Sequence, residues 1–186
     1  TSSTERTGYP SAPVAPLSFD VLGHNMADVR LIEAVVPSED GFYCMLGLKN
    51  GTHFSQTHHK TIQELEAEAD RLVALGVDVF FACGKFVTDE NRDASNCGWM
   101  QSFFLDIDCG EDKAKPDKRG RIRGYIDQPT GLQALKNLCR DMGLPRPTIV
   151  NSGRGWHVYW PLTEAVEKDK WLPAVSYTHL RAHETR

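Results

Sequence analysis

The sequence predicts an α+β domain, because short β-forming runs alternate along the chain with two amphipathic helical segments. The runs at residues 77–86 and 99–108 are rich in Val, Phe and other strand-forming side chains. The strand, basic connection, helix and strand between residues 99 and 160 resemble half of a split β-α-β sheet. We therefore expect a mixed or antiparallel sheet with flanking helices.

The first part of the predicted domain is a set of short strands. Residues 31–36 and 42–48 are apolar, β-like runs, and residues 52–54 follow the turn Lys49-Asn50-Gly51. An Asn-Gly pair between apolar runs is a strong hairpin signal, because both residues tolerate positive φ. The sequence thus predicts a β-hairpin across this turn.

Residues 61–75 form the clearest predicted helix. Thr61 and Glu64 have the spacing of a capping box, in which each side chain satisfies a backbone amide near the other. Apolar residues then recur on one face, and Gly76 supplies the stop. Residues 77–86 are predicted to follow as one buried strand.

The second half of the chain repeats the alternation of strand and helix. The strand at 99–108 ends in acidic residues and is followed by a basic loop. A helix is predicted from Gly131 to Met142, ended by Gly143. Two further strands are predicted at residues 148–152 and 156–160, separated by a tight Gly-Arg-Gly turn.

Composition bounds the class of protein. The 186 residues, 40% hydrophobic and 25% charged with a net charge of −4, suit one globular domain. The five cysteines are odd in number and contain no C-x-x-C pair, which indicates reduced thiols rather than a disulfide or zinc framework. No apolar run is long enough to span a bilayer. We expect a soluble, cytoplasmic protein with no membrane partner.

The two ends of the chain differ from the middle in composition. Residues 1–25 are rich in Ser, Thr, Pro and Ala and are predicted to be a flexible leader. Residues 176–186 resemble the translation of a sequencing adapter, so we expect residues 174–186 to be a non-native tail. The predicted domain spans residues 26–173.

Asp106 and Asp108 are the candidate metal ligands. In a strand, residues i and i+2 point to the same face, so both carboxylates can converge on one divalent ion or on a pair of ions. Mg²⁺ and Mn²⁺ prefer such oxygen ligands, shared with waters and substrate phosphates. The alternative is that the two acids begin a loop and are simply solvated.

The segment at residues 151–157 is the candidate phosphate-binding element. Its glycines let the backbone approach a ligand closely, and exposed amides together with a guanidinium suit a phosphate chain. His157 is expected to face the site while the neighbouring tryptophans pack behind it. The alternative is a glycine hairpin with a buried histidine. The candidate nucleotide-binding residues here are Ser152, Arg154 and His157.

A basic cluster lies between the acidic strand and the second helix. Six cations stand against a single acid, Asp117, and such a loop is either a nucleic-acid contact or a solvated surface. The candidate nucleic-acid-binding residues are Lys113, Lys115, Lys118, Arg119, Arg121 and Arg123.

The segments FFLDIDCG and GLPRPTIVNSGRGWHVYWPL resemble the archaeo-eukaryotic primase superfamily, especially the primase–polymerase domains of phage and plasmid replication proteins. The resemblance covers roughly residues 30–173 and implies an RRM-like catalytic core. It implies that Asp106 and Asp108 are catalytic and hold Mg²⁺ or Mn²⁺, and that Ser152, Arg154 and His157 bind the incoming triphosphate. Arg92 resembles a further recurring residue of phage-like members, with a nucleotide-binding role.

The same resemblance implies a function. A primase of this kind synthesises primers from NTPs or dNTPs on a single-stranded DNA template, and works with a fused or associated helicase. The third acidic residue of the family lies well beyond its second motif, and no acid from Glu164 to Asp169 is in a plausible buried strand. We therefore expect an active site that is incomplete in this sequence and has little turnover alone.

Three other functions fit parts of the pattern. A glycosyltransferase using D-x-D with Mn²⁺ and a nucleotide sugar explains Asp106 and Asp108 but not the segment that ends in His157. A non-catalytic RRM-like domain would bind nucleic acid through exposed aromatic residues on strands. A nuclease with a His-hydrophobic-His motif is disfavoured, because His58 and His59 are adjacent and so lie on opposite faces of any strand.

Overall fold

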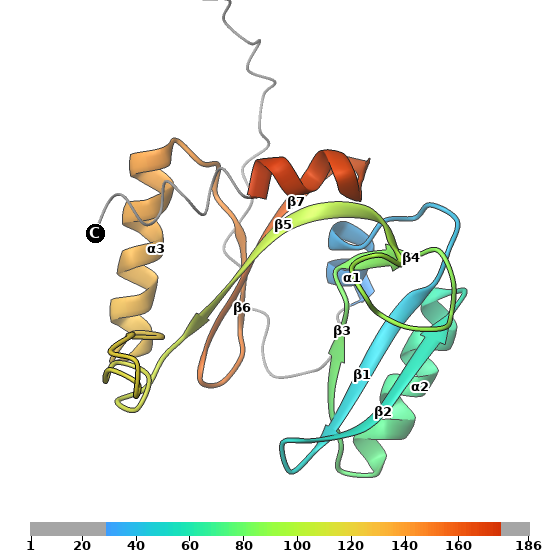
Figure 1. Cartoon of the computed structure of the whole chain (residues 1–186), viewed down its shortest axis with the longest axis horizontal. Helices are drawn as coiled ribbons and strands as arrows, with labels where there is room; N and C mark the ends of the chain where they lie inside the picture. The colour runs from blue at the N-terminus through green and yellow to red at the C-terminus, as the bar shows by residue number, and fades with distance from the viewer. Residues whose placement is uncertain (1–28, 176–186) are drawn as a thin grey trace, which may run out of the picture.

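The computed structural model describes residues 29–175, which form an α+β fold with four helices and two antiparallel sheets (Figure 1). The leader predicted for residues 1–25 lies outside the described residues, as do residues 176–186 of the predicted tail. Among the described residues, no helix is both long and apolar enough to cross a membrane.

The first sheet has three strands in the order β2-β1-β3. Its central strand, β1 (Tyr43–Lys49), pairs antiparallel with β2 (Thr52–His59) and with β3 (Asp78–Phe81). The turn between β1 and β2 has positive φ at both central residues, 53° at Asn50 and 74° at Gly51. The predicted Asn-Gly hairpin is confirmed.

The prediction of a strand at residues 31–36 is wrong, because this segment belongs to helix α1 (Val29–Val35). Ile32, Val35 and Val36 are almost fully buried, at the i, i+3, i+4 spacing of one helical face. A short apolar run has no clear period, so its partners decide between strand and helix.

The prediction of one strand over residues 77–86 is also wrong. The segment divides into β3, which pairs with β1, and β4 (Gly84–Phe86), which pairs with the second sheet. Between them, the amide of Ala82 still donates to the Cys44 carbonyl at 2.9 Å, but the chain then changes sheets. Continuous hydrophobicity reports burial and does not report which strand each half pairs with.

Helix α2 (Ile62–Ala74) covers one face of the first sheet. Its predicted capping box is confirmed, because the Glu64 amide donates to Thr61 Oγ1 and the Thr61 amide donates to Glu64 Oε2, each at 3.2 Å. Leu65 and Leu72 are buried against the sheet.

The second sheet has four strands in the order β4-β5-β7-β6. Strand β7 (Gly155–Glu167) lies between β5 (Cys97–Asp108) and β6 (Thr148–Asn151) and is antiparallel to both. Strands β5 and β6 are therefore parallel to each other, with β7 inserted between them. The predicted half of a split β-α-β sheet is confirmed.

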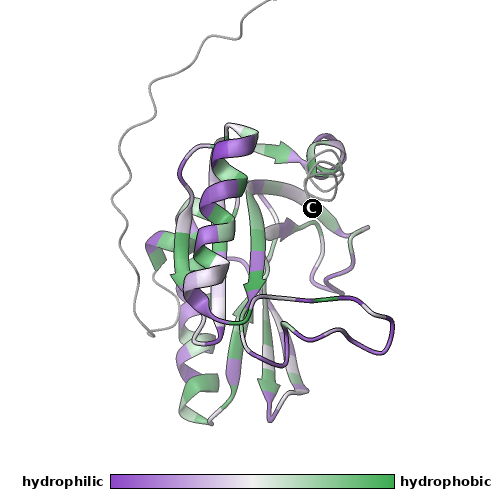
Figure 2. Cartoon of the chain, turned by 90° about the vertical axis from the view of Figure 1, so that its left-hand side faces the viewer, coloured by the Kyte–Doolittle hydropathy of each residue, from purple (hydrophilic) through white to green (hydrophobic). Residues whose placement is uncertain are grey.

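Helix α3 (Gln128–Met142) connects β5 to β6 and packs on one face of this sheet. It begins earlier than predicted, because the Asp127 side chain caps it by accepting from the Thr130 amide at 2.8 Å. It ends at Gly143, with φ 65°, as predicted. Figure 2 shows its hydrophilic and hydrophobic sides, and the apolar side contributes Leu135 to the core.

The opposite face of the second sheet is partly covered by α1. Ser102 Oγ on β5 donates to the Val35 carbonyl at 3.1 Å, and Tyr159 on β7 joins the core formed with the first sheet. The helix of residues 168–175 places Trp171 against two β5 aromatics, Phe103 and Phe104, at ring-centroid distances of 5.7 and 6.0 Å. Further along β5 the same face carries Asp106, whose side chain is 68% exposed.

Candidate functional site

Asp106 and Asp108 lie at the end of β5 on the face opposite α3. Ile107, between them, is buried in the core beneath that helix, so the two carboxylates point together to the other side. The Asp106 side chain is 68% exposed and that of Asp108 is 43% exposed. The sequence prediction that they share one face is confirmed.

His157 lies directly across the sheet from Asp106. The register pairs Asp106 with His157 and Asp108 with Gly155. The imidazole Nε2 is 3.9 Å from Asp106 Oδ1, so the two groups form an ion pair whenever the histidine is protonated. Trp156 packs on the far face, in the core under α3, as predicted from the strand alternation.

Asp108 has a cation beside it. Lys113 Nζ donates to Asp108 Oδ2 at 3.2 Å. The Lys113 carbonyl accepts from the amides of Arg123 and Gly124, at 3.2 and 3.1 Å, which closes the base of the basic loop. The sequence assigned Lys113 to nucleic-acid binding, whereas the structure places its ammonium on a candidate metal ligand.

Lys113→Met is expected to strengthen Mn²⁺ binding by up to about fivefold, because an exposed ion pair is worth about 0.2–1 kcal/mol and the Lys113 ammonium competes with the metal for Asp108. The free-Mn²⁺ electron paramagnetic resonance signal measures the change. Lys115→Met is the control, since among the described residues Lys115 forms no ion pair. Equal changes in Mn²⁺ affinity in both variants would show that the contact between Lys113 and Asp108 does not affect metal binding.

The Gly-Arg-Gly turn is organised by an asparagine and by the start of α3. Asn151 Oδ1 accepts from the Gly153 amide at 2.8 Å and from Gln128 Nε2 at 3.0 Å. The Gln128 carbonyl in turn accepts from Trp156 Nε1 at 3.1 Å. The sequence analysis identified neither Asn151 nor Gln128 as a residue that organises this turn. The Asn-Ser-Gly pattern signals the Asn151 turn, but no local signal points to Gln128.

Two glycines of this turn have different structural roles. Gly153 has φ 88°, a conformation that side chains other than glycine rarely adopt. Gly155 has no positive φ, but a Cβ there would collide with the Ile107 carbonyl oxygen of β5. Its small size therefore allows the close approach of β7 to the strand that carries the two aspartates.

Ser152 and Arg154 lie on this turn, at the same end of the sheet as Asp108. Both are exposed, and the Arg154 carbonyl accepts from the Cys109 amide at 2.9 Å, which joins the turn to the end of β5. Within residues 29–175, no side-chain hydrogen bond links Ser152 or Arg154 to the aspartates. The structure thus places them beside the acids without direct contact.

Arg92 lies elsewhere, in the loop between β4 and β5. Burial raises the pKa of the Cys44 thiol on β1 to about 11, and the charge of Arg92 offsets part of that rise. Arg92 therefore lies near the first sheet. In the described part of the chain, no hydrogen bond or ion pair joins it to Asp106 or His157.

The basic loop leaves β5 at Asp108 and returns to the same point. The Tyr125 amide donates to the Asp108 carbonyl at 2.9 Å, and the Gly110 amide donates to the Tyr125 carbonyl at 2.8 Å. Figure 2 shows the largely hydrophilic loop extending to one side of α3. The loop's cations are therefore attached at the acidic end of β5.

The carboxylate pair fits a metal shared with a substrate, rather than one enclosed by protein. Among residues 29–175, no group of three or more His, Cys, Asp and Glu side chains could hold a metal ion. Mg²⁺ is commonly bound through one or two carboxylates plus substrate phosphates. Glu164 and Glu167 lie on the extended β7, but both are exposed.

No protein-family model, curated protein or solved structure matches the chain. The site must therefore be interpreted from its own chemistry. One alternative loses support, because His58 and His59 lie next to each other on β2 and so occupy opposite faces. His58 packs edge-on against Phe86, while His59 Nε2 lies 2.9 Å from Thr57 Oγ1.

Proposed function

We propose that the chain is a nucleotidyltransferase domain of the primase–polymerase kind, which synthesises primers from NTPs or dNTPs on single-stranded DNA in phage or plasmid replication. The observation that carries the proposal is the pairing of β5 with β7. It places a carboxylate pair and an imidazole side by side on one open face, next to a glycine turn that presents a guanidinium.

The topology of the second sheet supports an RRM-like core. Four antiparallel-paired strands carry α3 on one face, and the site residues lie on the other. In such an arrangement the helix side is the core, while the open face is available to a nucleotide and a template. The position of Asp106, Asp108 and His157 on that face is consistent with catalysis there.

Each site residue has a proposed role. Asp106 and Asp108 are the residues that would hold Mg²⁺ or Mn²⁺, which when bound neutralises charge on the transferring phosphate. The Ser152 hydroxyl and the turn amides donate hydrogen bonds to the triphosphate oxygens, while Arg154 and His157 offset the charge of the triphosphate. Catalysis of 3′-hydroxyl attack on the α-phosphate would then rest on positioning and electrostatics.

A non-catalytic nucleic-acid-binding domain is the second candidate, and one observation favours it. Phe54 on β2, Phe80 on β3 and Phe104 on β5 are exposed aromatic residues on strands. Bases stack on such rings without any need for metal. In that case nucleic-acid binding would survive the double variant Asp106→Asn with Asp108→Asn, and no nucleotide would bind.

Nucleotide competition tests the proposal on the chain itself. A fluorescent ATP analogue is expected to bind in Mn²⁺ and to be released by EDTA, with NTPs or dNTPs competing better than UDP-sugars. This follows because the triphosphate offers more oxygens to Arg154 and His157 than a diphosphate sugar does. A preference for a UDP-sugar over every NTP would favour a glycosyltransferase, and the absence of metal-dependent nucleotide binding would refute the proposal.

A further inference from the structure

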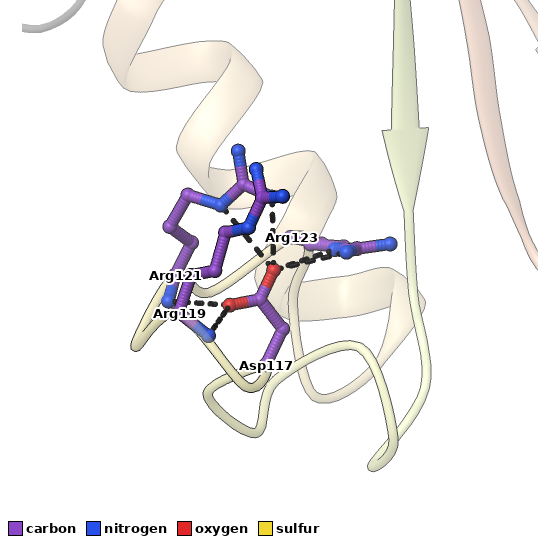
Figure 3. A network of polar contacts seen from close by, with 4 residues as sticks. All are labelled: Asp117, Arg119, Arg121 and Arg123. Carbon is purple, nitrogen blue, oxygen red and sulfur yellow. Dashed lines mark hydrogen bonds and ion pairs between the residues drawn. The ribbon is translucent and has the colours of Figure 1, made fainter.

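Asp117 is the centre of the basic loop (Figure 3). Its Oδ1 accepts from the amides of Arg119 and Arg121, at 2.8 and 3.0 Å. Its Oδ2 accepts from both Arg121 and Arg123 side chains, each through Nε and Nη2, at 2.9–3.3 Å. Asp117, the single acid between Lys113 and Arg123, is therefore fully used in holding the loop and its arginines.

The two guanidinium groups face Asp117 with one edge each and remain open on the other. Asp117 is only 15% exposed, whereas the Arg121 and Arg123 side chains are 59% and 61% exposed. A guanidinium has five N–H donors, and each arginine directs two nitrogens at the carboxylate. Outward-facing donors and one uncompensated positive charge remain.

We propose that Asp117 is a positioning residue, which holds Arg121 and Arg123 as a preset pair for the backbone phosphates of single-stranded nucleic acid. The proposal rests on the proposed function, which requires a template strand near Asp108. An arginine that is already oriented loses less rotamer freedom on binding a phosphate, and its planar fork matches the phosphate oxygens. Exposed Lys115 and Lys118 on the same loop add charge without this order.

The attachment of the loop places this pair beside the candidate catalytic face. Lys113 and Tyr125, at the two ends of the loop, contact the Asp108 side chain and the Asp108 carbonyl respectively. A strand bound along the loop would thus lead toward the nucleotide site. The hydrogen bonds that Asp117 accepts from Arg121, Arg123 and Arg119 lower its pKa to about 2. The carboxylate therefore stays ionised at any pH used for binding.

The test compares two Asp→Asn variants of the same loop. Asp117→Asn keeps an Oδ1 acceptor for the backbone amides but loses the carboxylate oxygen that holds both arginines. Asp112→Asn makes the same change in charge at an exposed residue that has no hydrogen bond or ion pair in the described part of the chain. If charge alone mattered, both variants would bind nucleic acid more tightly than the wild type.

Binding is measured by fluorescence anisotropy with a labelled single-stranded oligothymidylate in EDTA. Asp117→Asn is expected to bind about threefold or more weakly than wild type, with a shallower salt dependence because about one or two phosphate contacts are lost. Asp112→Asn should bind at least as tightly as wild type. Wild-type or higher affinity in Asp117→Asn would overturn the proposal, as would the absence of wild-type binding at low salt.

Because EDTA removes divalent metal, this result is independent of the metal–nucleotide site. Failure of the arginine pair would leave Mn²⁺-dependent nucleotide binding intact, whereas failure of the proposed function would remove nucleotide binding and leave oligonucleotide affinity unchanged. Circular dichroism melting controls for folding, since Asp117, Arg121 and Arg123 belong to neither core.

Discussion

Asp108→Asn is expected to weaken Mn²⁺-dependent nucleotide binding by about 100-fold or more, with Asp106→Asn having a similar effect. Even residues that only support a metal ligand typically cost 10–100-fold in affinity when changed, so loss of a direct ligand should cost at least as much. The amide that replaces the carboxylate keeps the shape but loses the charge that a divalent ion requires.

The fold should tolerate both changes. The Asp106 side chain is exposed and that of Asp108 is half-buried, and the neighbouring Ile107 keeps the strand in the core. Asp78→Asn, an exposed residue of the other sheet, is the control for the same chemical change. Titration of the fluorescent nucleotide measures affinity, and template-directed extension of a labelled primer measures activity. Wild-type nucleotide affinity in either site variant would refute the proposed metal site.

Gly155→Ala is expected to destabilise the fold by about 3 kcal/mol, in the range of overpacked cores, and so to lower Tm by roughly 10 °C. The added Cβ would collide with the Ile107 carbonyl oxygen and lie 3.3 Å from Asp108 Cα. Both are backbone atoms, which cannot rotate away as a side chain can. To make room for the added Cβ, strand β7 must therefore move away from β5 at the position of the two aspartates.

Gly98→Ala is the matched control. Like Gly155 on β7, Gly98 on β5 lies in a strand and has no positive φ, but the nearest atom to an added Cβ is a methyl group of Val87 at 3.1 Å. That side chain can give way, so we expect a change of less than about 1 kcal/mol. Thermal unfolding followed by circular dichroism measures both variants. Equal Tm values for Gly155→Ala and wild type would show that β7 can move away from β5 without loss of stability.

Much of the local structure could be predicted because its causes are close together in the sequence. The Thr61–Glu64 capping box, the Asn50-Gly51 turn and the end of α3 at Gly143 each depend on residues within one turn of the chain. The errors have the opposite origin. Residues 31–36 were predicted as a strand because a short apolar run suits either structure, and only its packing selects the helix.

The site was predictable to the same extent. Alternation along β5 was enough to place Asp106 and Asp108 on one face, and alternation along β7 was enough to separate His157 from Trp156. That Asp106 lies opposite His157 depends on the register between two strands separated by the basic loop and α3. The contact between Lys113 and Asp108 depends likewise on how that loop returns to the strand.

The sequence by itself determined the types of element, the faces that their side chains occupy and the chemistry available to the site. Periodicity and capping are properties of neighbouring residues, and the chain carries them wherever it folds. Only the tertiary structure decided that residues 77–86 divide between two sheets. It also decided that the small size of Gly155 allows β7 to approach β5, and that Asp117 forms ion pairs with both Arg121 and Arg123. Each of these depends on which segments meet in space, because strand partners and loop closure are selected by the packing of the whole core.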